Sequence, residues 1–466
     1  MDRRHVLTLI AYSAGLGLLV GLVAASFTWL LYQVQEYVLG YLVGYLPPGY
    51  SGENGLLHTF RNPHPWVLLL LLPLLFAGAS LLGHNRGLAK IIAAYHQTAR
   101  ATLREKLRYA LGSLVELGAG SPMGREGPMA VLGDWMGDAL GRRFLPADLA
   151  RHLPFAGLAA GFAAAFHAPV GGALLAVEIF FPGLVLAIAS LGPALIGALA
   201  GFTVYGAFWG YEPLLSLQPL PPRWYHLGFA LLLGALMAAV GTLLVHAVRA
   251  VRRASAGLSF MPRHALLGLI IAAVAALLPQ TLGDGLVWVE LGSTPILPVA
   301  FLVLLAAVRT LLLGLVYGLG GYGALIGPTL ALGGLYAVAL ARALPAYAPD
   351  AQAAALVGMG ALLAGVVRTP FAALLLVSEF GGYAVLPLAL PAIFVAYVLT
   401  PVQVFPEQNL AAESIAAAPF AGLRVGELTF EIRGVVRDGR ELAAERELVL
   451  EADDRLLLPR RGLRVE

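Results

Sequence analysis

One short segment combines a carboxylate with the glycines and the proline typical of a helix start: Gly124-Arg125-Glu126-Gly127-Pro128. Proline is favoured at the first position of a helix because its missing N–H would be unpaired there, so Pro128 marks a helix start. Unpaired amides and the positive end of the helix dipole attract anions at such a site. Glu126 therefore competes with a bound anion, and its protonation would release the site. A glutamate that merely favours a helix start at the surface is the alternative.

A second segment repeats the pattern without the acid: Gly323-Ala324-Leu325-Ile326-Gly327-Pro328. Pro328 again marks a helix start, and the amides before it are expected to bind an anion directly. Two converging helix starts can replace the hydration shell of a halide without a full positive charge, so the anion can also leave. The alternative is an ordinary helix that begins with proline and packs against a neighbour.

Both segments belong to a longer pattern that occurs twice in the chain. Residues 127–133 and 327–333 share the sequence GPxxxLG, and each is followed by an apolar segment that runs from proline to glutamate, at 169–178 and 370–379. Matched anchors in the same order predict a duplicated unit, although chance similarity between helices rich in Gly and Ala is an alternative. The interrupted segments are expected to be broken or re-entrant helices that line a cavity or are buried in protein.

The composition predicts the surroundings that position these segments. The chain has 466 residues, of which 59% are apolar and 12% charged, and its mean hydropathy is +0.80. Such a chain cannot build a water-exposed surface, and several segments reach the roughly 20 apolar residues that span a bilayer. We expect an all-α polytopic membrane domain over residues 1–412, with repeats at roughly 10–210 and 225–410.

Charge and cysteine content exclude several other kinds of protein. Arginine and lysine gather at 3–4, 104–108 and 249–263, which the positive-inside rule places in the cytoplasm together with the N-terminus. The net charge of +3 gives little support for nucleic-acid binding. The chain has no cysteine, so it forms no disulfide and has no thiolate chemistry. No nucleophile, metal or nucleotide motif indicates an enzyme or a cofactor.

The segment 124–128 and the stretch 157–169, GLAAGFAAAFHAP, resemble the gating-glutamate signature and the GAAAGLAAAFNAP stretch of the CLC family of chloride channels and chloride/proton antiporters. The resemblance runs over roughly residues 10–410. It implies two inverted repeats with broken and re-entrant helices, a homodimer in the cell membrane, and Glu126 as the external gate. The substrates would be chloride, or a similar monovalent anion, and protons.

The chain departs from the family pattern at three places. Asn85-Arg86-Gly87 stands where the family has the serine of its first anion loop, and Phe405 stands where it has a late tyrosine. The internal proton-relay glutamate corresponds to Ile179, and the neighbouring Glu178 is a possible substitute or an ordinary carboxylate at a helix end. The resemblance implies these anion-binding residues: Arg86, Gly87, Gly124, Arg125, Gly127, Leu325, Ile326, Gly327 and Phe405.

These departures leave two functions open, a proton-coupled exchanger and a passive channel of the same fold. The tail at 413–466 alternates apolar and charged residues, which predicts a small β-rich cytoplasmic module with the C-terminus inside the cell. Its turns resemble the TrkA-C or RCK-C regulatory module of potassium-transport proteins. A plain β cap is the alternative.

Overall fold

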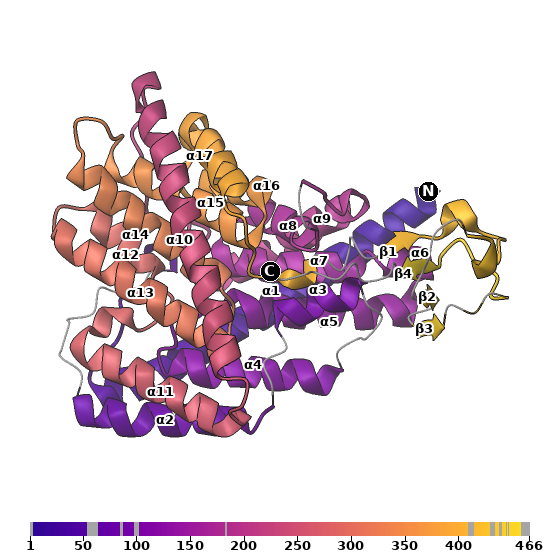
Figure 1. Cartoon of the computed structure of the whole chain (residues 1–466), viewed down its shortest axis with the longest axis horizontal. Helices are drawn as coiled ribbons and strands as arrows, with labels where there is room; N and C mark the ends of the chain where they lie inside the picture. Colours follow the sequence, from indigo (N-terminus) through magenta and orange to yellow (C-terminus); the bar gives the residue numbers. More distant parts are fainter. Residues whose placement is uncertain are drawn as a thin grey trace.

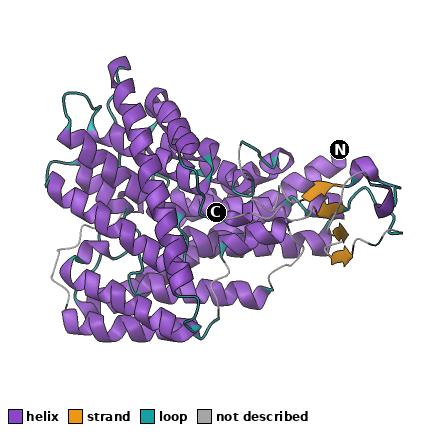
Figure 2. Cartoon of the chain, viewed as in Figure 1, coloured by secondary structure: helices purple, strands orange, loops and turns teal. Residues whose placement is uncertain are grey.

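The computed structural model contains helices almost throughout, with a few short strands gathered at one end of the view (Figure 1, Figure 2). Its described residues are 3–53, 64–83, 87–96, 102–181, 184–408, 414–428, 434–437, 440–443, 445 and 447–457. In the first half the helices are α1 (Arg3–Gln35), α2 (Pro65–Ser80), α3 (Leu88–His96), α4 (Leu103–Gly118), α5 (Glu126–Phe144), α6 (Ala147–Ala150), α7 (Leu153–Phe166), α8 (Pro169–Glu178) and α9 (Leu191–Trp209). In the second half they are α10 (Leu227–Ala254), α11 (Phe260–Leu277), α12 (Leu286–Ser293), α13 (Val299–Leu319), α14 (Ile326–Ala343), α15 (Ala351–Val367), α16 (Pro370–Gly381) and α17 (Leu386–Leu399).

The outer surface of the helices is apolar, as the composition predicts for a multi-pass membrane protein. Within the described residues, 7 helical segments are long and apolar enough to cross a membrane. Large apolar side chains such as Trp29, Leu232 and Leu304 are exposed on these helices. A water-soluble protein rarely exposes so many, whereas a bilayer covers them. The expectation of an all-helical membrane fold is therefore confirmed.

The helices expected to be interrupted differ in length. Helices α8 and α16 have 10 and 12 residues, too few to cross alone. In contrast α5 and α14 have 19 and 18 residues, and α14 is long enough to span. The prediction that α14 is too interrupted to span is wrong, because glycine in this helix does not end it. These glycines instead allow close packing: a Cβ on Gly333 would lie 2.2 Å from the carbonyl oxygen of Gly358 on α15.

The two halves of the chain contain elements with matching ends. Helices α4 and α13 are each followed by a glycine with positive φ, Gly120 at 87° and Gly320 at 91°. Helices α7 and α15 end at residues in the same left-handed conformation, His167 and Arg368. Glycine close packing also recurs, because a Cβ on Gly133 would lie 2.1 Å from the carbonyl oxygen of Gly157. These correspondences agree with the predicted repeat, whose boundaries stay a prediction.

Four short strands follow the helical part. They are β1 (Ser414–Ala416), β2 (Gly434–Arg437), β3 (Arg440–Ala443) and β4 (Arg455–Leu457), and they form one sheet in the order β1-β4-β2-β3. All neighbouring pairs are antiparallel. The resemblance of this segment to a TrkA-C module stays a prediction.

Candidate functional site

The two glycine-rich loops found in the sequence meet in the structure. Gly124 N–H donates to the carbonyl oxygen of Ala324 at 2.7 Å, and Ala324 N–H donates to that of Gly124 at 2.9 Å. The starts of α5 and α14 are thereby held next to each other. The paired helix starts expected from the sequence lie together, although they are separated by much of the chain.

The Glu126 carboxylate lies at the start of α14. Its side chain is buried, and its Oε1 accepts a hydrogen bond from Gly327 N–H at 2.9 Å. Gly124 leaves room for this carboxylate, because a Cβ there would lie 1.9 Å from Glu126 Oε2. An acid bound to the amide of a helix start uses the same donor that would bind an anion. The alternative of a surface glutamate does not fit a buried side chain.

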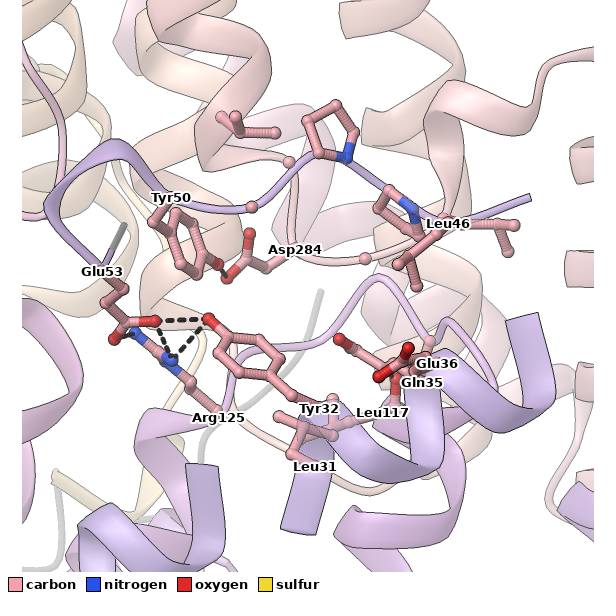
Figure 3. A pocket seen from close by; sticks show the side chains of 18 of the residues that line it. Leu31, Tyr32, Gln35, Glu36, Leu46, Tyr50, Glu53, Leu117, Arg125 and Asp284 are labelled. Carbon is pink, nitrogen blue, oxygen red and sulfur yellow. Dashed lines mark hydrogen bonds and ion pairs between the residues drawn. The ribbon is translucent and has the colours of Figure 1, made fainter. Parts of the chain in front are cut away.

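The Arg125 side chain is turned to a separate group of polar residues (Figure 3). Its guanidinium forms an ion pair with Glu53, and Tyr32 also donates to the Glu53 carboxylate. His167 Nε2 lies 3.3 Å from Glu53 Oε1. Burial acts to raise the pKa of Glu53, but Arg125 and His167 outweigh burial and hold the pKa well below its usual range. The Arg125 side chain is therefore committed to Glu53, and the place of Arg125 in the anion site stays a prediction that concerns its backbone.

The Arg125 cavity, as we name the space lined by Tyr32, Tyr50, Glu53, Arg125 and Asp284 among others, has a volume of about 330 Å³ (Figure 3). Tyr50 donates a hydrogen bond to Asp284, and the Arg125 guanidinium lies 4.9 Å from the centre of the Tyr50 ring. Met123, one residue before Gly124, also lines this cavity. The cavity therefore reaches the first glycine-rich loop.

The Gly87 cavity, of about 410 Å³, reaches the second loop. It brings together predicted site residues from three distant parts of the chain, Gly87, Leu325 and Phe405. Arg86 lies outside the described residues. Sequence reasoning missed four polar side chains that also line this cavity. They are Lys90, Arg252, Tyr317 and Glu407.

The missed side chains give the Gly87 cavity both charge and hydroxyl groups. Burial raises the pKa of Glu407 above its usual range, although Arg252 lies near it. A second missed hydroxyl, that of Tyr109 on α4, donates to the carbonyl oxygen of Gly323 at 2.9 Å. Of these two tyrosines, Tyr317 lines the same cavity as Phe405. No local motif marks these positions, so only the fold reveals them.

Glu178 caps the start of another short helix. Its two carboxylate oxygens accept hydrogen bonds from Phe371 N–H at 3.1 Å and Ala372 N–H at 2.7 Å, at the start of α16. Glu379 at the end of α16 caps α8 in return, accepting from Val170 N–H at 3.0 Å and Gly171 N–H at 2.6 Å. Each helix therefore ends in the acid that caps the other.

Taken together, the geometry defines a membrane protein with interrupted helices in which a buried acid binds the start of a helix from the opposite half. The chain belongs to the voltage gated chloride channel family, whose model matches residues 66–401. Members of this family are transporters or channels, which confirms that the chain is not an enzyme.

Named relatives agree with this assignment. The chain is 32% identical to a protein named chloride channel protein ClcB-like from Ralstonia nicotianae, over 74% of this chain and 85% of the relative. It is 29% identical to the voltage-gated ClC-type chloride channel ClcB of Escherichia coli, over 75% of this chain and 88% of that relative. It is 32% identical to the H⁺/Cl⁻ exchange transporter ClcA of Vibrio parahaemolyticus, over 62% of this chain and 66% of that relative.

Solved structures share the fold. A slow cyanobacterial Cl⁻/H⁺ antiporter superposes with a TM-score of 0.72 at 24% identity, covering 84% of this chain and 94% of the other. A CLC-type fluoride/proton antiporter gives the same TM-score, 0.72, at 21% identity, covering 88% of this chain and 99% of the other. These similarities show the helical fold.

Proposed function

We propose that the protein exchanges chloride, or a similar monovalent anion, for protons across a membrane. One observation carries the proposal: the buried Glu126 carboxylate accepts the N–H of Gly327 at the start of α14. This amide is a donor suited to an anion, so carboxylate and substrate compete for it. Relatives named as H⁺/Cl⁻ exchange transporters support the same function.

The anion site would be built mainly from backbone. Its amides would come from the two loops, at Gly124, Gly127, Leu325, Ile326 and Gly327, with Phe405 and Gly87 on the side of the Gly87 cavity. Bare glycines let the anion approach the amides closely. Of Arg125, only the backbone would take part, because the side chain is paired with Glu53.

Protonation of Glu126 would couple the two substrates. A neutral carboxyl group binds the α14 amide more weakly than a carboxylate does, since charge-assisted hydrogen bonds are roughly twice as strong as neutral ones. An anion can then replace the side chain, and when the anion leaves, Glu126 can lose its proton and return. Because the Arg125 cavity and the Gly87 cavity reach the two paired loops, the acid would stand between them as a gate.

A passive channel of the same fold is the second candidate. It is favoured by Ile179 at the position of the internal relay and by the hydrogen bonds of Glu178, whose two oxygens are both used to cap α16. An exchanger without an acid at that position would have to pass protons through water or another group.

Assembly and orientation complete the proposal. By family resemblance the protein would be a homodimer in the cell inner membrane, with one anion path in each subunit and both termini in the cytoplasm. The strands β1 to β4 would form a small cytoplasmic module with a regulatory role, as in TrkA-C domains.

Purified protein in liposomes tests the proposal. A chloride gradient is imposed without a pH gradient, and chloride and protons are recorded together. Exchange predicts that protons move against their electrochemical gradient, whereas a channel moves chloride alone. The same recording with fluoride and nitrate identifies the preferred anion. No anion flux at all would contradict both candidates.

A further inference from the structure

A buried acid and a buried histidine that the proposed function does not use lie behind the second glycine-rich loop. Glu116 on α4 and His264 on α11 are both 0% exposed. Glu116 Oε1 lies 2.6 Å from His264 Nδ1, a hydrogen-bond distance. Two titratable side chains this deep in a membrane protein call for a physical reason, since each loses its hydration on burial.

The other oxygen of Glu116 contacts the loop itself. Oε2 accepts the N–H of Tyr322 at 2.8 Å, one residue before Gly323. The stretch from Tyr322 to Gly327 is thus bound at both ends by acids from the first half, Glu116 at one end and Glu126 at the other. Any change in the charge of Glu116 acts directly on the segment that carries the predicted anion amides.

The repeat does not account for this pair. The carbonyl oxygen of Glu116 accepts Ser121 N–H, and that of Val316 accepts Gly321 N–H, both at 2.9 Å. The two residues therefore hold the same place at the ends of α4 and α13. Because the equivalent position is valine, the acid is an addition to the first half and not a requirement of the fold.

His264 has room for one more proton. Its Nε2 is buried and has no hydrogen-bond partner among the described residues. With Nδ1–H donating to Glu116, Nε2 carries a lone pair. A proton there would create an imidazolium paired with the carboxylate, next to the Phe260 ring, whose centre lies 4.3 Å from that of the imidazole. Both contacts favour the charged imidazole.

We propose that Glu116 and His264 form a second proton-binding site that sets the anion affinity of the Tyr322–Gly327 loop. This inference rests on the proposed function. Without the extra proton the pair carries one negative charge close to the loop and opposes anion binding; with the proton it is neutral. Proton binding to the pair and anion binding to the loop therefore favour each other, and this coupling is reciprocal.

The helices packed around the pair differ in the titratable groups that they carry. Helix α2, which packs against both α4 and α11, has no titratable residue between Pro65 and Ser80. The titratable groups on the other elements packed against α4 and α11, and on these two helices themselves, are the following: Arg3, Arg4, His5, Tyr12 and Tyr32 on α1, Arg104, Glu105, Lys106, Arg108 and Tyr109 on α4, Glu126, Asp134, Asp138, Arg142 and Arg143 on α5, Arg263 on α11, Arg309 and Tyr317 on α13, and Tyr322. Of these groups, Glu126 is the proposed gate, and its substitution removes its charge from the measurement.

The test uses the Glu126→Gln variant, in which the gate no longer titrates. Chloride affinity is measured by calorimetry between about pH 5 and about pH 8, the range in which histidine titrates. We expect the affinity to fall by about fivefold or more as the pH rises, the lower range of typical coupling between sites. Adding Glu116→Gln and His264→Gln together should abolish this pH dependence of the chloride affinity. The affinity should then stay near the value that Glu126→Gln alone reaches at low pH.

Two controls separate the proposal from a structural role. The buried His152, whose Nδ1 lies 2.8 Å from Ser190 Oγ, is a matched control, and Glu126→Gln with His152→Gln should keep the slope. Titrations of the Glu126→Gln protein in buffers of different ionisation enthalpy need no further substitution, and they should reveal proton uptake on chloride binding.

Each result bears on one claim. A flat affinity profile without proton uptake overturns the proton site and leaves the exchanger intact, as does a slope that survives replacement of the pair. Failure of Glu126→Gln to bind chloride at any pH overturns the proposed anion site and this inference with it.

Discussion

Two regions of the molecule use the same interaction, an acid that binds the start of a helix from the other half, but they use it differently. Between α8 and α16 the interaction is reciprocal, since Glu178 caps α16 and Glu379 caps α8. At the glycine-rich loops it is one-sided: Glu126 binds the start of α14, and Ile326 offers no acid in return.

The difference indicates which contact is able to change. In the reciprocal pair each acid uses both oxygens on backbone amides, so removal of either one leaves two amide donors without this partner. Glu126 holds α14 through its hydrogen bond from Gly327 N–H, next to glycines that leave space for an anion. The reciprocal caps suit a fixed part of the structure and the single contact suits a gate.

The largest expected difference is in proton movement, between the Glu126→Gln and the Glu178→Gln variants. Glu126→Gln should abolish proton movement in the liposome assay because the acid that competes with the anion for the α14 amide is lost, while anion flux persists. Glu178→Gln should retain coupled proton movement because Glu178 serves as a cap. Loss of proton flux in Glu178→Gln would make Glu178 a relay and would remove the distinction between the two regions.

Glu53→Gln tests the fixed support next to the gate. Removal of one partner of a buried ion pair costs about 3 to 5 kcal/mol of unfolding free energy, and Glu53 pairs with Arg125 directly before Glu126. The folded-state pKa of Glu53 is depressed, so its contribution is present above the unfolded pKa of about 4.3 and is lost as pH falls below it. Thermal unfolding should therefore show a Tm difference that is constant above about pH 5 and shrinks in stronger acid.

Glu178→Gln and Glu379→Gln are a matched pair for stability. Each replaces a carboxylate that accepts two amides by a group with one acceptor oxygen, which should cost about 1 to 3 kcal/mol. The two losses should be of similar size, measured as a lower Tm in detergent. A marked loss in one variant and none in the other would contradict the reciprocal arrangement.

Tyr109→Phe should have the smallest effect. It removes the hydroxyl that donates to Gly323 O and leaves that carbonyl without this donor, at a cost of about 1 kcal/mol. Because Gly323 belongs to the second loop, anion affinity should weaken by a factor of about 5, equivalent to that energy. Calorimetry on Tyr109→Phe checks this, with Tyr12→Phe on α1 as a control that should leave the affinity unchanged.

The sequence predicted the parts of the site that local patterns encode. Pro128 and Pro328 mark helix starts, and Glu126 beside glycine indicates competition with an anion, so these residues were found without a structure. Arg125 is assigned to the anion site by the family motif, and no local pattern shows that its side chain pairs with Glu53 in a distant segment. Tyr109, Tyr317 and the Glu116–His264 pair were missed for the same reason, since their meaning depends on which helices pack together.

The most direct test of the account is the position of bromide, an anion with anomalous X-ray scattering, in crystals of wild-type protein and of Glu126→Ala. Competition for one amide predicts bromide within hydrogen-bond distance of Gly327 N–H in Glu126→Ala and no bromide there in wild type above neutral pH. Bromide absent from Gly327 in Glu126→Ala, or bound beside an unmoved Glu126 carboxylate in wild type, would contradict the account.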